Sequence, residues 1–594
     1  MTEQSLSDSR RDRPRHRRIG LAMLVAGAIV LLCGVWIVVT AMMARDQLDQ
    51  MRTEVQTLRA KISAADWSAA RATTTEVAKH AQRANQLTSG PVWALAARLP
   101  SGGEPLQTIR GITAGVDALG RDALPPLVGA AERVDPRKLR RPDGSIDLTR
   151  IASVGPVVKS ASASVAQTAK AISGLPRHTW LSSVDAAQVD ALKLVTDLDG
   201  TLKSADLAVR ILPKMLGQNG AKRYFLAFQN ESEARGTGGL PGAFAILEAN
   251  RGKLRLVRLE SDTTLNDVAA DVDFGPDYRQ LYRDAGPTTV YVNGNVSPHF
   301  PYAAQIWASM WREHSGEQVD GVIAVDPTAL SYLLAVTGPA TLPDKSQVSA
   351  GNAVELTQRT IYAKFANDPT QERRRAFQLS IAAAASKKIL EAQGKTTGLV
   401  QAVGKAAEER RLLVWSADPA VQTDLAQTSL AGIIPTTKAP YVGLSINNGG
   451  GNKLDYYLGR ALTWQRSGCG PTRRTTVTIT LTNSAPASGL PGYVTGRTDR
   501  RSYAVKVGDS RLGVAYLATE GALLQSLTVA GKPATSAIGL EHRHPVYTVD
   551  LEVPRGTSRT IVLNLTEPAG KGEPIVLRQP LVRPLEVTLD DDCR

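Results

Sequence analysis

The sequence has few of the residues from which metal sites are most often built. Of its 594 residues only 3 are cysteine and 7 are histidine. His542 and His544 stand close together, but no partner cysteine and no HExxH spacing accompanies them. Solvated loop residues are therefore the better interpretation of this pair, and the sequence gives no sign of a zinc site.

Motifs for nucleophilic catalysis and nucleotide binding are also missing. The chain contains no G-x-S-x-G nucleophile elbow and no Walker sequence. Its glycine-rich run at residues 236–242 (GTGGLPG) leads into a predicted strand rather than into a helix. Since a dinucleotide fingerprint must open a helix, this run argues against nucleotide binding.

Basic charge is present in excess, with 70 Lys and Arg against 56 Asp and Glu and a formal net charge of +14. Such an excess is typical of proteins that meet nucleic acid, anionic lipid or anionic polymer. The most concentrated basic charge stands directly before an apolar run, so we interpret it as a signal of membrane topology before a binding signal. The arginines concerned are Arg10, Arg11, Arg13, Arg15, Arg17 and Arg18.

The apolar run covers residues 19–44 and contains no ionisable side chain except Cys33. It is long enough to cross the roughly 30 Å hydrocarbon layer as one helix. The sequence AMMA at residues 41–44 is a poor cleavage site, so we expect an uncleaved membrane anchor rather than a removed signal. The positive-inside rule then makes residues 1–18 a cytoplasmic tail and places the chain after Arg45 outside the plasma membrane. Nucleic-acid binding ranks last, because the concentrated basic charge is cytoplasmic and no recognised module accompanies it.

The remaining two cysteines, Cys469 and Cys593, both lie in the part of the chain that we expect to be exported. An oxidising compartment favours a disulfide between them. Two free thiols are the alternative, because geometry decides whether cysteines can pair.

Residues 45–216 have helical periodicity, and we predict a helical stalk and bundle. Directly after the membrane run, apolar residues recur in steps of three and four, as in a coiled coil. This stripe predicts packing either on a partner chain, as in a homo-oligomer, or on the helices that follow. Its members are Leu48, Met51, Val55, Leu58, Ile62 and Ala65.

Two further domains are predicted after the bundle, so the fold class is multidomain. Residues 221–440 alternate strands, at 224–228, 243–248, 253–259, 288–293, 321–325 and 412–415, with helices, at 301–314, 327–336, 354–366 and 370–393. This alternation indicates a three-layer α/β domain. Residues 441–594 carry short strands at 475–482, 501–507, 513–518, 523–529, 545–553 and 557–565, a pattern typical of an all-β sandwich.

The candidate site lies where predicted strands of the α/β domain end in charged and polar residues. We expect a polar loop after Phe228 and a second charged segment after the hairpin strand at 253–259. Carboxylates there suit a hydrated Mg²⁺, with Asp262 as the candidate ligand, and arginines suit phosphate oxygens. An ion-pair network that closes the end of the sheet is the alternative. The predicted ligand-binding residues are Asn230, Glu233, Arg235, Arg258 and Asp262.

Four sequence blocks in and after this region resemble the domain-of-unknown-function family DUF4012. They are residues 228–239 (FQNESEARGTGG), 319–327 (VDGVIAVDP), 333–339 (LLAVTGP) and 452–457 (NKLDYY). The resemblance implies a membrane-anchored envelope protein of the kind found widely in actinobacteria. It implies no activity, because the family has no settled activity.

A more distant resemblance is to the LytR-CpsA-Psr phosphotransferases, which move glycopolymers from polyprenyl-pyrophosphate carriers onto peptidoglycan. Residues 259–263 (LESDT) are similar to their second block, whose Asp and Thr fall on Asp262 and Thr263. The phosphate-binding arginine of that block falls on Ser261, so Arg258 or Arg235 would have to replace it.

Three functions follow from these patterns. The first is an envelope protein whose α/β domain binds an anionic glycan or a polyprenyl-phosphate lipid. The second is a glycopolymer phosphotransferase with Mg²⁺ on Asp262, in which electrostatic clamping of the transferred group supplies most of the catalysis. The third is a structural or partner-recruiting role without catalysis.

Overall fold

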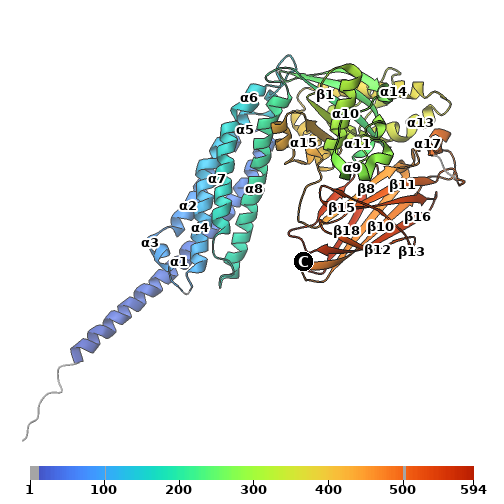
Figure 1. Cartoon of the computed structure of the whole chain (residues 1–594). Coiled ribbons are helices and arrows are strands. Elements are labelled where there is room, and N and C mark those ends of the chain that lie inside the picture. The colour runs from blue at the N-terminus through green and yellow to red at the C-terminus, as the bar shows by residue number, and fades with distance from the viewer. Residues whose placement is uncertain (1–12, 101, 500–502, 594) are drawn as a thin grey trace, which may run out of the picture. The chain divides into compact units, whose positions relative to one another are not determined.

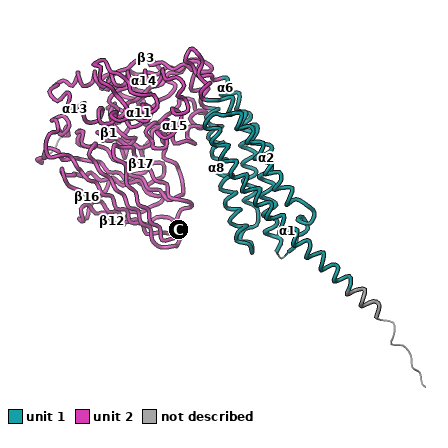
Figure 2. The backbone as a smooth tube through the Cα atoms, turned by 180° about the vertical axis from the view of Figure 1, so that it is seen from behind, with its two compact units in different colours: residues 1–135, 149–210 teal, residues 136–148, 211–594 magenta. Residues whose placement is uncertain are grey.

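The computed structural model describes residues 13–100, 102–499 and 503–593. Most of the predicted cytoplasmic tail, residues 1–12, lies outside them. The chain forms two compact units, coloured separately in Figure 2. Unit 1 comprises residues 1–135 and 149–210, and unit 2 comprises residues 136–148 and 211–594. The domain bounds predicted from the sequence stay a prediction.

Unit 1 is a helical bundle, as the periodicity predicts. Its core is a stripe of aliphatic side chains that includes Leu119, Val165 and Leu202. Alanines at the contact positions, such as Ala81 and Ala84, let neighbouring helices approach closely. The helices are α1 (Arg13–Ser63), α2 (Trp67–Thr88), α3 (Pro91–Ala96), α4 (Glu104–Ala118), α5 (Leu124–Arg133), α6 (Leu148–Ser153), α7 (Gly155–Ser173) and α8 (Ser182–Met215).

Helix α1 contains the apolar run and continues into the bundle without a break. By length and composition its part from Leu21 to Ser63 could cross a membrane, with a mean hydropathy of 2.8 in its most apolar window. Further along, Leu58 packs with Ala70 and Val128 of the same chain. Leu58 and Ile62 of the predicted apolar stripe therefore pack within the bundle, and a homo-oligomer through the stalk stays a prediction.

The first part of unit 2 is the predicted three-layer α/β domain, built on a five-stranded mixed sheet of order β3-β2-β1-β4-β7. Strand β1 runs parallel to β4, while the other neighbouring strands are antiparallel. The strands are β1 (Lys222–Arg235), β2 (Gly238–Asn250), β3 (Lys253–Ser261), β4 (Gly321–Val325) and β7 (Leu412–Ser416). A separate small ribbon is formed by β5 (Ala340–Thr341) and β6 (Gln347–Val348).

Helices cover both faces of this sheet (Figure 1). Strand β4 passes directly into α11 because Asp326 caps it, accepting a hydrogen bond from the Ala329 backbone N–H, and Pro327 suits the first turn. The helices are α9 (Gly275–Tyr282), α10 (Phe300–Ser315), α11 (Pro327–Thr337), α12 (Ala353–Glu355), α13 (Ile361–Lys364), α14 (Glu372–Leu390), α15 (Thr396–Glu408) and α16 (Pro419–Leu425).

Two local predictions for this domain are wrong. The polar loop expected after Phe228 is strand, since β1 continues to Arg235 and pairs with β2 up to Asn230 and again at Ala234 and Arg235, with an irregularity between. The strand expected at 288–293 is a turn that ends in a 3-10 helix, Tyr291–Asn293. Tyr291 of this segment is buried against the rings of Phe225 and Phe244 rather than paired in a sheet.

The second part of unit 2 is a β-sandwich of a six-stranded sheet (β13-β12-β16-β10-β9-β18) and a five-stranded sheet (β14-β15-β11-β8-β17). Alternating apolar residues such as Trp464, Val477 and Leu512 fill the space between the sheets. The elements are β8 (Tyr441–Asn448), β9 (Leu458–Ser467), β10 (Thr472–Asn483), α17 (Gly492–Thr495), β11 (Ser510–Leu517), β12 (Leu523–Val529), β13 (Lys532–Pro533), β14 (Ala537–Glu541), β15 (His544–Val553), β16 (Ser558–Pro568), β17 (Ile575–Arg578) and β18 (Leu585–Asp591). The strand predicted at 501–507 is wrong over its described residues 503–507, which form no strand.

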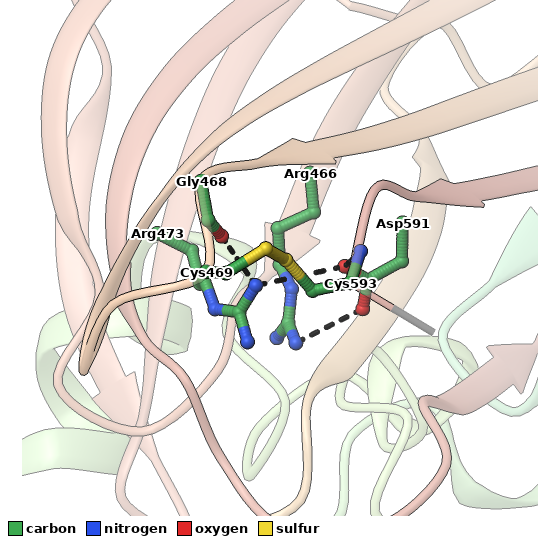
Figure 3. The surroundings of a disulfide bond; sticks show 6 residues. All are labelled: Arg466, Gly468, Cys469, Arg473, Asp591 and Cys593. Atoms are coloured by element: carbon green, nitrogen blue, oxygen red, sulfur yellow. Dashed lines mark hydrogen bonds and ion pairs between the residues drawn. A yellow bond between two sulfur atoms is a disulfide. The ribbon is translucent and has the colours of Figure 1, made fainter.

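A disulfide joins Cys469, in the turn between β9 and β10, to Cys593 just after β18 (Figure 3). The two Cα atoms are 5.6 Å apart, within the usual range for a bridge. An ion pair of 3.0 Å between Arg466 and Asp591 lies beside it. The end of the chain is thereby tied to the start of the sandwich.

Candidate functional site

Alternation along the strands of the α/β domain sends side chains to two different faces of the sheet. On β1, Phe225 and Ala227 point to one face, while Leu226 and Phe228 point to the other. The first face is covered by α10 and is tightly filled. Phe225 stacks on Phe244 with ring centroids 4.7 Å apart, and it also lies against Trp307 of α10.

The second face, under α11, α14 and α15, is not filled. A cavity of about 560 Å³ lies between the sheet and these helices. Its walls are almost entirely aliphatic, and side chains from every strand of the sheet remain half-buried because they border open space. These are Leu226, Phe228, Leu247, Leu254, Leu256, Ile323, Val325 and Leu412. The helices contribute Leu330, Leu333, Ile381, Ser386, Leu399 and Val403.

A second pocket, of about 530 Å³, adjoins the cavity and shares part of its lining, including Leu254, Leu256 and Leu390. In contrast to the cavity, it carries four cationic side chains and two acidic ones, Asp143 and Glu391. We call it the basic pocket. Its cations are Arg140, Lys253, Arg255 and Lys387.

Residues 136–148 form a strap that lines both spaces. Although the strap stands between two bundle helices in the sequence, it belongs to unit 2. Arg140 and Ile146 form a β-bridge across it, and the Ile146 N–H donates to the Gly252 carbonyl at 2.9 Å. Arg140 Nη1 donates to the Leu390 carbonyl of α14 at 2.8 Å. The strap thus fixes Arg140 at the junction of cavity and basic pocket.

Polar side chains also line the cavity. Asn230 belongs to β1, and Asp326 directly follows the end of β4. Asn230 Nδ2 donates to the Tyr362 hydroxyl at 2.7 Å. Asp326 accepts from Arg411 Nη1 at 2.8 Å, and the same guanidinium holds Glu231. Burial, followed by the charge of Asp326, raises the pKa of Glu231 well above its usual value although Arg411 opposes the shift.

Of the predicted ligand-binding residues, only Asn230 lines this cavity. Glu233 and Arg235 are buried beside it in an ion-pair network with Lys453, in which Arg235 Nη2 lies 3.0 Å from Glu233 Oε1. Burial by itself would raise the pKa of Glu233, but Lys453 and Arg235 together hold it below its usual value. Arg235 also donates to Asn293 Oδ1 at 3.0 Å. These contacts favour the ion-pair alternative for Glu233 and Arg235.

Arg258 and Asp262 lie toward the other face of the sheet. The Arg258 guanidinium sits over the Trp311 ring of α10, 5.6 Å from its centroid, and 3.7 Å from Glu317. Asp262 accepts from the Ser261 hydroxyl at 2.7 Å. Among the described residues no group of three His, Cys, Asp or Glu side chains could hold a metal ion, so Mg²⁺ on Asp262 stays a prediction.

The glycine-rich run after β1 has a packing role in the hairpin to β2. A Cβ on Gly236 would lie 2.3 Å from the Val296 carbonyl oxygen, and one on Gly239 would lie 2.2 Å from the Asn230 carbonyl carbon. Neither position has room for a side chain. The glycines therefore let this hairpin pack closely on residues 296–298 and on β1 itself. Gln579 of the sandwich donates to the Arg235 carbonyl beside it at 2.6 Å.

Sequence reasoning missed the cavity. The available signal is that β1 and β4 are apolar on both faces, which predicts helices on both sides of the sheet. That pattern cannot distinguish a filled face from an open one, because apolar residues line both faces. The strap was missed too, since residues 136–148 carry no motif of their own.

Comparison with known proteins gives a family and a distant structural likeness. No curated protein matches the chain. The Lin1025 protein from Listeria innocua is similar at 14% identity, covering 36% of this chain and 81% of that one, with a TM-score of 0.20. Residues 219–362 match the family model described as "Protein of unknown function (DUF4012)". This stretch holds four of the five strands of the α/β sheet, β1 to β4, together with α10 and α11. Residues 219–362 thus match this family model, as the sequence blocks of this region predict.

Proposed function

We propose that this chain is a single-pass, membrane-anchored envelope protein whose α/β domain binds a lipid of the polyprenyl-phosphate class. The lipid has a long apolar chain, which occupies the cavity, and an anionic headgroup. The observation that carries the proposal is the aliphatic cavity of about 560 Å³ on one face of the sheet.

The size and lining of the cavity favour an apolar occupant. Protein interiors are close-packed, and voids larger than a water molecule are few. The space is partly open, so its apolar lining stays in contact with solvent, at a cost of roughly 25 cal/mol for each Å² of apolar surface that is not buried. Water is a poor filling, because a bound water needs two to four polar partners and these walls are aliphatic. An apolar chain removes the cost and buries its own surface.

The basic pocket supplies the headgroup end. Arg140 is fixed at the junction of the two spaces, and Lys253 and Lys387 add ammonium groups around the same pocket. Arg255 is partly neutralised, because its guanidinium lies 3.1 Å from Glu248. A phosphate suits such a cationic pocket, and a chain attached to it would enter the cavity through the shared lining. A glycan alone fits less well, because its hydroxyl groups would find few partners in the cavity.

The proposal stops at binding. A phosphotransferase of the kind expected from residues 259–263 needs Asp262 beside the bound headgroup, whereas Asp262 contacts Ser261 in a turn outside the cavity lining. A structural role without a ligand remains the competing account, and it predicts an empty cavity.

The test uses the full chain purified in mild detergent and measured by native mass spectrometry with lipid extraction. We expect a co-purifying prenyl-phosphate or a related anionic lipid. In Ser386→Trp the indole projects from α14 into the cavity, so lipid retention should fall at least about tenfold. Ala376→Trp, at an exposed position of the same helix, is the control and should retain the lipid.

An empty parent protein that also fails to take up added polyprenyl phosphate would overturn the proposal. Equal retention by Ser386→Trp and Ala376→Trp would place the lipid elsewhere on the protein and would overturn it as well. Circular dichroism and thermal melting of both variants establish that each is folded.

A further inference from the structure

Large apolar side chains are exposed at one end of the helical bundle. Leu95 is 73% exposed, Leu99 is 59% exposed and Trp180 is 65% exposed. They come from two connections that are far apart in the sequence. Leu95 and Leu99 belong to α3 and the turn after it, and Trp180 belongs to the turn between α7 and α8. The two connections meet, because Trp180 Nε1 donates to the Gly102 carbonyl at 3.1 Å.

This end of the bundle is the one from which the apolar part of α1 extends (Figure 1). Trp93 of α3 is fully buried, and its indole N–H donates to Thr40 Oγ1 of α1 at 2.9 Å. The hydrogen bond sets the position of α3 along α1. The exposed apolar side chains therefore lie at the level where the apolar run ends.

Helix geometry relates that level to a membrane. The apolar run covers residues 19–44, and about 20 residues are enough to cross the hydrocarbon layer. If the run begins to cross at its first residues, Thr40 emerges in the headgroup layer on the far side. Trp93 then holds α3 in the same layer.

We propose that Leu95, Leu99 and Trp180 form a membrane footing, an interaction surface by which the bundle rests on the lipid headgroup layer around α1. Tryptophan is enriched at this depth because its ring is apolar and its N–H is polar. Arg98 and Arg177 are exposed beside the apolar residues, where their guanidinium groups reach anionic headgroups. The footing gives the bundle a second contact with the bilayer and limits its tilt about the anchor.

A spin label on the full chain tests the footing in vesicles of phosphatidylcholine and phosphatidylglycerol. Cys33→Ser removes the free thiol, and the Cys469–Cys593 disulfide remains. Labels are placed at Leu95→Cys and, in a second protein, at Trp180→Cys. Ser160→Cys is the control, because Ser160 is exposed near the opposite end of α7.

We expect collisions with oxygen, which concentrates in lipid, to exceed collisions with a water-soluble nickel chelate at both footing positions. The ratio should be several-fold higher there than at Ser160. Equal ratios at all three positions would overturn the proposal. Dipolar broadening that disappears on dilution with unlabelled protein would also overturn it, since the patch would then contact a second copy of the chain. The outcome is independent of lipid retention in the cavity, so the two proposals fail separately.

Discussion

The two faces of one sheet differ sharply in how they are filled. On the face under α10, Phe225, Phe244, Trp307 and Trp311 are completely buried and pack ring against ring. On the face under α11, α14 and α15, aliphatic side chains from the same strands border a cavity of about 560 Å³. Neighbouring residues of one strand thus take part in stability on one side and in a proposed binding site on the other.

The difference shows that hydrophobicity alone does not make a core. Both faces are apolar, but several large aromatic side chains fill the space under α10, whereas mainly Leu, Ile and Val, together with Phe228, line the cavity. Large aromatic residues supply area and volume that Leu, Ile and Val cannot. A face kept aliphatic and open costs stability, and a bound apolar chain would restore it.

The largest expected effect is a difference in the free energy of unfolding between alanine variants of two phenylalanines of β1. Phe225→Ala should lower the free energy of unfolding by about 3–5 kcal/mol, because it leaves a void in a close-packed core. Phe228→Ala should cost about 1 kcal/mol in delipidated protein, because Phe228 already borders open space. Urea unfolding followed by tryptophan fluorescence measures both. Similar losses in the two variants would remove the distinction between the faces.

The stability of the protein should depend on pH through a buried carboxyl group on the packed side of the domain. Tyr282 of α9 donates a hydrogen bond to this group, Glu541 of the sandwich, at 2.6 Å. Burial raises the pKa of Glu541 to about 7, although hydrogen bonds from Ser297 and Tyr282 oppose the shift. Below about pH 4.5 the carboxyl group is neutral in both states and costs nothing. As the pH rises from about 4.5 to 7 the unfolded state ionises first, so the protein loses up to about 3 kcal/mol of stability.

Glu541→Gln should remove this loss, because the amide stays neutral at every pH. Relative to the parent, the variant should gain stability between pH 4.5 and 8, as measured by urea midpoints at both values. Glu586→Gln, at an exposed position of β18, is the control and should follow the parent. Equal changes in the urea midpoints of the parent and of Glu541→Gln over this window would contradict the buried neutral carboxyl group.

The smallest expected effect concerns the headgroup. Lys253→Glu combined with Lys387→Glu reverses two charges of the basic pocket and should weaken retention of an anionic lipid several-fold. Retention of a neutral prenyl alcohol should change little, because the cavity walls are untouched. Lys532→Glu combined with Lys571→Glu, both at exposed positions of the sandwich, makes the same change in net charge and is the control. An equal loss of retention for the anionic and the neutral lipid would show that the basic pocket does not bind the headgroup.

The sequence predicts the architecture of this chain well, because the architecture depends on strong local patterns. The β4 strand and the start of α11 follow from an apolar run, a capping Asp326 and Pro327. The membrane run, the bundle and many strands of the sandwich follow from periodicity in the same way. Predictions fail where tertiary contacts decide, as at Tyr291, whose apolar segment is packed under a helix rather than paired in a sheet.

The candidate site was less predictable from the sequence. Clustered charged residues form a recognisable pattern, whereas an unfilled space between side chains leaves none. Glu233 and Arg235 suggested a ligand site, and in the structure Glu233 forms ion pairs with both Arg235 and Lys453. Ile323 and Leu412 gave no signal, because an aliphatic residue that lines a cavity cannot be told from one that fills a core. Only the distance between sheet and helices separates the two, and no local pattern encodes it.

The central claim, that a lipid chain occupies the open face of the sheet, is tested most directly by photocrosslinking. Benzoylphenylalanine replaces Phe228 in the full chain, which is irradiated in membranes and analysed by intact-protein mass spectrometry. The same residue at Tyr503, exposed beside β15 of the sandwich, is the control. We expect a lipid adduct at position 228 and none at position 503. Crosslinks at position 228 that join only protein to protein would contradict it.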